Sequence, residues 1–359
     1  MIIEFAFTTI IAALLLGVPF LRRMYFASLV KGGNTEKGSK RIEYFDFLRG
    51  LAIIAVIIIH IGDLFLKNSI GSREIIYFVN DLMRFAVPFF LISSGVLLVF
   101  KNPKEFYAKK ITRIFIPYAL ITILVGMFYS LSFFDIAHGI LSGSASVPYY
   151  FLSVLLQFYI LYPFLERLSK KRGFLYFSFI LTVLALITKE VWAFYDIPLF
   201  IRYLFFFAYG ISLKNRFLNS EVSYTKPEKY FWVGSVFVYI IIIILIVIPN
   251  VEIGGYFYNT RLFYAIALFN VFFIFKEHIE KFFAFELFSS LGKNSLWIYL
   301  IHYFVLQALF AIILKIGNAF YFQYLIFVIF GVPLSVVASL FTKKIYNSFF
   351  SLLIIKPVK

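Results

Sequence analysis

The strongest chemical signal in the sequence is a set of ionisable residues inside one apolar run. Arg49, His60 and Asp63 interrupt an aliphatic segment that is predicted to span a membrane as a helix over about 45–66. Arg49 and His60 are eleven residues apart, which places them on one helix face, about 16 Å apart along the axis. Asp63 follows one turn after His60 and can orient its imidazole. Because ionisable groups are costly in a membrane, this set indicates a functional site with His60 as a proton-exchanging group.

Structural interpretations of the same residues stay open. Arg49 can extend its side chain to lipid headgroups, and His60 can form a hydrogen bond between helices. The joint occurrence of an Arg, a His and an Asp on one side of one apolar helix favours the functional interpretation.

Other polar residues fall within further apolar segments. Asp81 and Arg84 are three residues apart and can neutralise each other. Ser94 precedes a glycine, and small residues of this kind allow helices to pack closely. Pro88 is expected to bend the same helix. His302 lies in the middle of a late apolar run, where a structural hydrogen bond is the simplest role.

Lys110 and Arg113 belong to a basic segment that precedes Pro117. On one helix face they could bind phosphate groups on the cytoplasmic side, although anchoring to anionic lipids also explains such a cluster. His138 and His278 fall in predicted loops, and the chain has no Cys. Two membrane histidines without a carboxylate or Cys cluster are a weak metal signal, so no metal site is expected.

The composition indicates what kind of protein holds these residues. Of the 359 residues, 62% are apolar and 14% are charged, and the mean hydropathy is +0.92. Soluble domains have roughly 45–50% apolar and about 25% charged residues, so a soluble enzyme is excluded. The net charge of +16 follows from Lys and Arg in cytoplasmic loops, and no nucleic-acid partner is expected.

We therefore predict an all-α fold, a polytopic transmembrane helical bundle of about eleven helices with ~20 residues each. The segments 101–113 and 135–147 are expected as loops, and 276–293 is expected to lie along the inner membrane surface. Of the 34 Lys and Arg residues, 26 fall in alternate segments assigned to the cytoplasm and 5 on the other side. This bias places the N-terminus outside and the C-terminus in the cytoplasm. The predicted spans are 2–21, 45–66, 76–100, 114–134, 148–165, 173–189, 198–213, 230–248, 261–275, 294–314 and 319–342.

Four segments, in this order, resemble the membrane-bound acyltransferase family 3. Phe45–Ala52, continued to His60, has an Arg-x10-His pattern, and Phe85–Gly95 follows. The basic segment Lys110–Pro117 comes next, and Ser295–His302 has a Ser-x-x-x-Tyr-Leu-x-His pattern. The resemblance implies a ten-helix acyltransferase core at 41–345. An extra N-terminal helix with a cytoplasmic linker occupies 1–40, and a short basic cytoplasmic tail occupies 346–359.

The resemblance also implies an activity. An acyl group, expected to be acetyl, is transferred from cytoplasmic acyl-CoA to a hydroxyl of an extracytoplasmic glycan or lipid-linked sugar. His60 is the candidate general base, because a neutral imidazole can accept a hydroxyl proton, and Asp63 is expected to orient it. Arg49 holds the donor phosphates or stabilises the oxyanion. Lys110 and Arg113 are the further candidates for binding acyl-CoA.

Arg84, Ser94 and His302 are the candidates for contacting the acceptor. The protein is expected to be a multi-pass protein of the cytoplasmic membrane, surrounded by membrane lipids.

A different class of function suits the same residues, namely an exporter or flippase for a polysaccharide or lipid-linked sugar. Intramembrane charges and Pro-bent helices fit either class, but the absence of a visible internal repeat counts against a transporter. A third possibility is a structural partner in a surface-glycan assembly.

Overall fold

The computed structural model describes residues 43–188, 193–194, 197–214, 224–247, 261–316 and 319–352, together with residue 19. Most of these residues are helical, and the described strands, β1 (Ala193–Phe194) and β2 (Ile197–Pro198), form one short antiparallel ribbon. The predicted all-α class is therefore confirmed. The predicted helix at 2–21 lies outside the described residues apart from residue 19. The described α-helices are α3 (Glu43–Lys67), α4 (Arg73–Met83), α5 (Ala86–Leu97), α6 (Pro103–Lys110), α7 (Ile116–Phe128), α8 (Phe133–Ser142), α9 (Tyr150–Leu168), α10 (Phe174–Ile187), α11 (Leu204–Ser212), α13 (Lys226–Ile242), α14 (Arg261–Ile274), α15 (Lys276–Glu280), α16 (Phe285–Lys293), α17 (Ser295–Ile313) and α18 (Phe320–Leu352).

The helices have the length and surface of a membrane bundle. Seven of the described helical segments are long and apolar enough to cross a membrane, and shorter apolar helices accompany them. Large apolar side chains stay exposed on the outside, among them Phe128, Phe134 and Phe283 at 81%, 82% and 91%. Exposed apolar surface of this extent is typical of contact with a membrane. The chain is a multi-pass membrane protein, and each predicted span from 45 onward overlaps helical segments, with two helices in the span at 76–100.

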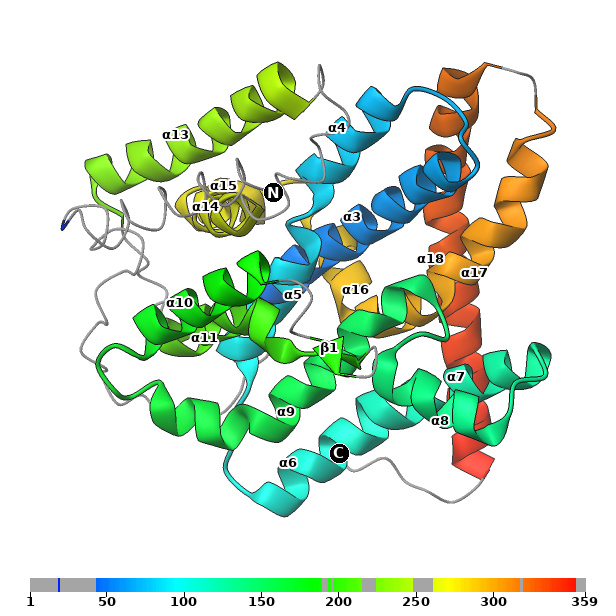
Figure 1. Ribbon diagram of the computed structural model, residues 1–359, viewed down its shortest axis with the longest axis horizontal. Coiled ribbons are helices and arrows are strands. Elements are labelled where there is room, and N and C mark those ends of the chain that lie inside the picture. Colours follow the sequence, from blue (N-terminus) through cyan, green and yellow to red (C-terminus); the bar gives the residue numbers. More distant parts are fainter. Residues whose placement is uncertain are drawn as a thin grey trace.

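Helix α3 lies at the centre of the bundle. It packs against α4, α5, α16, α17 and α18, and Figure 1 shows it in blue between α5 and the α17–α18 pair. Its side chains are apolar nearly all round, as expected for a helix buried on every side. Glu43 and Asp46 in the first turn and Lys67 in the last turn complement the helix dipole.

The start of α3 is fixed by a very close contact with α16. A Cβ atom on Gly50 would lie 1.9 Å from the carbonyl oxygen of Phe288, and one on Gly292 would lie 1.7 Å from that of Asp46. Only glycine allows two helix backbones to approach so closely. This contact ties the segment predicted to lie along the membrane surface to the helix that carries Arg49.

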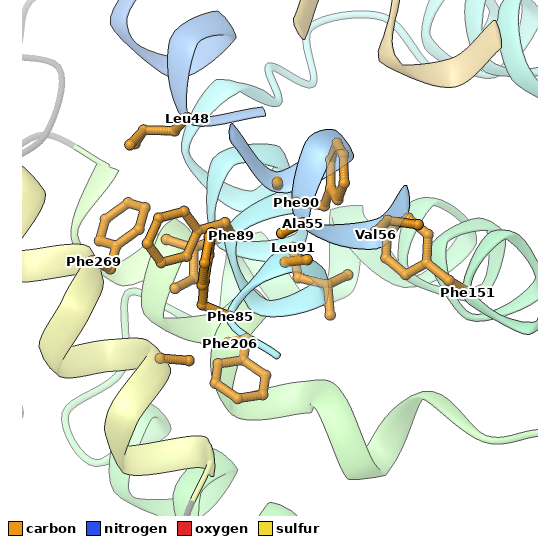
Figure 2. Packing of buried hydrophobic residues seen from close by; sticks show 14 of the residues in the cluster. Leu48, Ala55, Val56, Phe85, Phe89, Phe90, Leu91, Phe151, Phe206 and Phe269 are labelled. Atoms are coloured by element: carbon orange, nitrogen blue, oxygen red, sulfur yellow. The ribbon is translucent and has the colours of Figure 1, made fainter. Parts of the chain in front are cut away.

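An aromatic core surrounds α3 and α5. Figure 2 shows Phe89 and Phe90 of α5 beside Ala55 and Val56 of α3, with Phe206 of α11 nearby. These side chains belong to one continuous buried cluster. Rings packed at this density have little freedom to move, so the core holds α3 and α5 at a fixed distance.

The predicted span at 76–100 is two helices rather than one bent helix. α4 ends at Met83 and α5 begins at Ala86, so the chain turns at Arg84. Pro88, which is expected to cause the bend, is the third residue of α5. At that position its missing N–H costs no helical hydrogen bond. The break therefore precedes the proline and leaves Arg84 at a helix end.

The predicted loop at 101–113 is helical. α6, a π-helical turn at Ile111–Phe115 and α7 form one run from Pro103 to Phe128. Asn102 caps this run by accepting a hydrogen bond of 3.0 Å from the Lys104 backbone N–H, and Pro103 occupies the first position. Both are helix-start signals. Hydropathy does not detect them because the first turns are polar.

The predicted loop at 135–147 also contains helix, because the preceding span ends early at Phe128. α8 begins with a capping box in which Ser132 and Asp135 bond each other's backbone N–H groups. It ends at Gly143, whose φ of 76° is in the left-handed region. At the other end of the chain, α18 continues to Leu352, past the predicted end at 342.

Candidate active site

Helix α3 carries Arg49 and His60 into two separate cavities. We call them the Arg49 cavity, of about 370 Å³, and the His60 cavity, of about 180 Å³. Because α3 is unbroken from 43 to 67, the two residues are about 16 Å apart along its axis. The polar residues lining the Arg49 cavity are Arg49, Ser94, Arg113, Tyr159, Lys293, Ser295 and Tyr299. Those lining the His60 cavity are His60, Asp63, Arg84, Tyr150, Arg202, Tyr203, Arg261 and Tyr299.

His60 is paired with Asp63 in the manner expected from the sequence. Its Nδ1 lies 3.3 Å from Asp63 Oδ2, within ion-pair distance but off the line of a full hydrogen bond. Asn80 Nδ2 of α4 donates a hydrogen bond of 3.1 Å to the other carboxylate oxygen. The His60 side chain is 10% exposed and that of Asp63 is 24% exposed. With the ring proton on Nδ1, toward the carboxylate, Nε2 is the proton acceptor of the neutral imidazole.

His302 lies behind His60 and does not form part of the cavity wall. Its ring centre is 5.4 Å from that of His60, and the residue is fully buried. Its Nδ1 is 3.0 Å from the Ile298 carbonyl oxygen and 2.9 Å from that of Tyr299. Carbonyl oxygens only accept, so Nδ1 carries the proton. His302 is therefore a direct neighbour of His60 that lies outside the described lining of the cavity.

Arg84 lines the His60 cavity, where the sequence predicts an acceptor contact. The adjacent Asp81 interacts electrostatically with Arg84 and forms an ion pair with Arg261 of α14. The Asp81 side chain is 2% exposed and that of Arg261 is 11% exposed. The pairing expected within α4 is thus extended by an arginine that lies 180 residues later in the chain.

Arg202 and Arg261 are cavity residues that the sequence interpretation did not select. Arg202 lies in the 3-10 turn Phe200–Tyr203 that leads into α11, and Arg261 is the first residue of α14. Arg202 falls inside a predicted span, so the cost of a charge in the membrane was a signal that could have identified it. Arg261 is the first residue of a predicted span, a position at which a charge gives no such signal.

The Arg49 cavity is positively charged. Arg49, Arg113 and Lys293 line it, and no acidic residue is among its described lining residues. Guanidinium groups bind phosphate through paired hydrogen bonds. Ser94, a candidate acceptor contact, also lies in this cavity and so groups with the predicted donor residues.

Lys110 and Arg113 border a second cationic hollow next to the Arg49 cavity. We call it the Lys101 cavity; it measures about 480 Å³ and is also lined by Lys101 and Lys109. Lys110 Nζ lies 4.6 Å above the ring centre of Tyr159, a cation–π contact. Arg113 lines both cavities, and Lys110 is close enough to Arg49 and Arg113 for their charges to repel. The predicted donor-binding residues are therefore brought together.

Tyr299 connects the two halves of the site, since it lines both the Arg49 and the His60 cavities. Its hydroxyl donates a hydrogen bond to the Pro148 carbonyl oxygen, and its ring centre lies 5.8 Å from that of His302. The tyrosine is 4% exposed. It is the residue that the described linings of the two cavities share.

Within the described ranges, no group of three or more His, Asp or Glu side chains is arranged to hold a metal ion.

A family described as an acyltransferase domain matches residues 42–343. No curated protein and no solved structure matches the chain. The matched range begins just before α3, extends into α18 and contains every residue that lines the two cavities.

Proposed function

The chain belongs to the acyltransferase 3 family, and from this premise we propose that it transfers an acyl group, acetyl in the simplest case, from acyl-CoA to a hydroxyl of a glycan or lipid-linked sugar. One observation carries the proposal. A single helix holds Arg49 in a cationic cavity and His60 in a second cavity, and Tyr299 forms part of the wall of both.

The donor is assigned to the Arg49 cavity and the adjoining Lys101 cavity. Acyl-CoA carries several phosphate charges at one end and its thioester at the far end of an extended arm. Arg49, Arg113 and Lys110 supply charge-assisted contacts for the phosphates. Arg49 lies about 16 Å along the helix from His60, too far to contact the reacting carbonyl, so we assign it to phosphate binding and not to the oxyanion.

The acceptor is assigned to the His60 cavity. His60 Nε2 takes the proton of the acceptor hydroxyl while the hydroxyl oxygen bonds to the thioester carbon. The carbon–sulfur bond then breaks, and the protonated imidazole returns its proton to the departing thiolate. The products are an ester and free CoA thiol. Asp63 holds the ring and stabilises its charged form, as carboxylate partners of histidine do.

Tyr299 is assigned to the passage between the two cavities. Its ring narrows the path along which the acyl end of the donor reaches His60. A closed wall also keeps water from His60, and exclusion of water prevents hydrolysis of a reactive thioester.

The membrane orientation follows from the basic residues. Because 26 of the 34 Lys and Arg residues fall in segments assigned to the cytoplasm, we place the Arg49 end of α3 on the cytoplasmic side and the His60 end nearer the outer face of the cytoplasmic membrane. Donor and acceptor then enter from opposite sides. Transfer through the membrane needs no translocation of the whole CoA molecule.

The test uses the purified full-length chain in lipid vesicles with isotope-labelled acetyl-CoA and an extract of surface glycans. Mass spectrometry then counts acetyl esters on the glycans, and vesicles without the protein are the control. Labelled ester together with equimolar free CoA thiol supports the proposal. Movement of glycan across the vesicle membrane without acetyl-CoA and without ester would support the exporter or flippase function instead.

A further inference from the structure

Three arginines from distant parts of the chain converge on the His60 cavity. Arg84 comes from the turn between α4 and α5, Arg202 from the turn before α11, and Arg261 from the start of α14. Each lies on a different element from the α3 helix that carries His60. The cavity measures about 180 Å³, so the three guanidinium groups and the imidazole share one small space.

The charges of the described residues in and beside this cavity do not balance. Asp63 is the acidic residue among the described lining residues, and Asp81 lies behind Arg261 as its ion-pair partner. Among the described residues, three guanidinium groups face these two carboxylates, which is a net charge of one positive when His60 is neutral. An excess cation at membrane depth is costly and requires a partner.

Structural ion pairing accounts for only part of the cluster. Arg261 is held by the buried Asp81. Arg202 differs, because its Nε is buried and has no hydrogen-bond partner among the described residues. A buried guanidinium nitrogen without a partner costs free energy, and a ligand that accepts its hydrogen bond would remove this cost.

We propose that the acceptor carries an oxyanion group, a carboxylate or a phosphate, which Arg202 and Arg84 bind while the hydroxyl to be acylated faces His60. This inference rests on the proposed function and names the chemical class of the acceptor. The planar donors of Arg match the paired oxygens of both groups. Because the cavity is small, the anionic group lies close to the reacting hydroxyl.

The test compares three probes with the same alkyl tail: octyl glucoside, octyl glucuronide and octyl glucoside 6-phosphate. Their binding to the full-length chain in lipid nanodiscs is measured with labelled probe. We expect at least one anionic probe to bind about tenfold or more tightly than the neutral probe. A preference for the glucuronide assigns the anion to a sugar carboxylate, whereas a preference for the 6-phosphate assigns it to a phosphate.

The variants separate the anion site from general damage. Arg202→Gln should remove most of the preference for the anionic probe, measured as the ratio of the dissociation constants of the neutral and anionic probes. Arg202→Lys should keep part of it, since the charge stays but the paired donors are lost. Arg84→Gln is a second test should the Arg202 variants fold poorly. Arg73→Gln, an exposed arginine at the start of α4 that lies outside the cavity, is the matched control.

Equal binding of all three probes, or a preference that persists in both Arg202→Gln and Arg84→Gln, would overturn the inference. Acetyl transfer is followed separately in the same samples. Anion-selective binding without acetyl transfer to any probe would support the inferred anion site and count against the proposed function. Acetyl transfer at equal rates to the neutral and anionic probes would support the proposed function and contradict the inferred anion site.

Discussion

Arg49 and His60 extend from one helix, α3, into two different cavities. The spacing between them is fixed by the unbroken helical backbone and is about 16 Å along the axis. One rigid element therefore sets the distance between the group that we assign to the donor phosphates and the group that we assign to proton transfer. The close contact of Gly50 and Gly292 with the facing backbones fixes the Arg49 end of this element.

Removing the Arg113 side chain should weaken acyl-CoA binding. Arg113→Ala is expected to raise the dissociation constant about tenfold, since a charge-assisted contact to phosphate is lost. Equilibrium binding of labelled acyl-CoA measures the effect. Lys170→Ala is the control, because it removes a basic residue at an exposed position after α9. Equal, small effects of both substitutions would indicate anchoring to anionic lipid instead.

Neutralising Asp63 should slow transfer without affecting the donor. Asp63→Asn keeps the shape of the side chain but no longer stabilises a protonated His60. We expect kcat to fall about tenfold to 100-fold, with an unchanged KM for acyl-CoA. Steady-state kinetics of CoA thiol release in the presence of acceptor provide both values. Glu74→Gln, an exposed acid-to-amide change on α4, should leave kcat as it is; an equal fall in both variants would contradict the role of Asp63.

Opening the wall at Tyr299 should allow water to reach the thioester. Tyr299→Ala is expected to raise CoA thiol release in the absence of any acceptor by several-fold, because the ring no longer separates the cavities. Tyr299→Phe keeps the ring and loses only the hydrogen bond to Pro148, so it should stay near the native rate. A folded Tyr299→Ala protein with unchanged acceptor-independent release would show that Tyr299 does not close the passage.

The proposed orientation can be tested with single cysteines, since the native chain has none. Ser144→Cys lies between α8 and α9 and should react with a membrane-impermeant maleimide on intact cells. Lys170→Cys, at the other end of α9, should react only after permeabilisation. Both positions are exposed. Reaction of Lys170→Cys in intact cells would reverse the orientation.

The positions of the apolar helices could be predicted from the sequence because hydropathy and charge alternate along it. Helices that begin in polar segments could not be predicted from hydropathy. Asn102 and the pair Ser132 and Asp135 begin helices in segments predicted as loops, and their capping bonds depend on side-chain type rather than on polarity. The turn at Arg84 depends on tertiary packing of α4 and α5, which a local pattern does not contain.

The site was predictable where its residues share one helix and not where they meet across the bundle. His60 and Asp63 are one turn apart, so helical periodicity alone predicted their contact. The pairing of Asp81 with Arg261 joins residues 180 positions apart, and no local spacing indicates it. The same holds for Tyr299, whose position in the wall of both cavities results from the packing of α17 against α3.

The central claim is that His60 accepts the proton of the acceptor hydroxyl, and the measurement that tests it most directly is the transfer rate of His60→Gln. Gln keeps hydrogen bonding but cannot act as a base near neutral pH. We predict a protein that folds in the membrane and binds acyl-CoA normally, with acetyl transfer to glycan lowered by about 10²-fold or more. His138→Gln, at an exposed position on α8, should keep its activity. Near-native transfer by a well-folded His60→Gln protein would contradict the account.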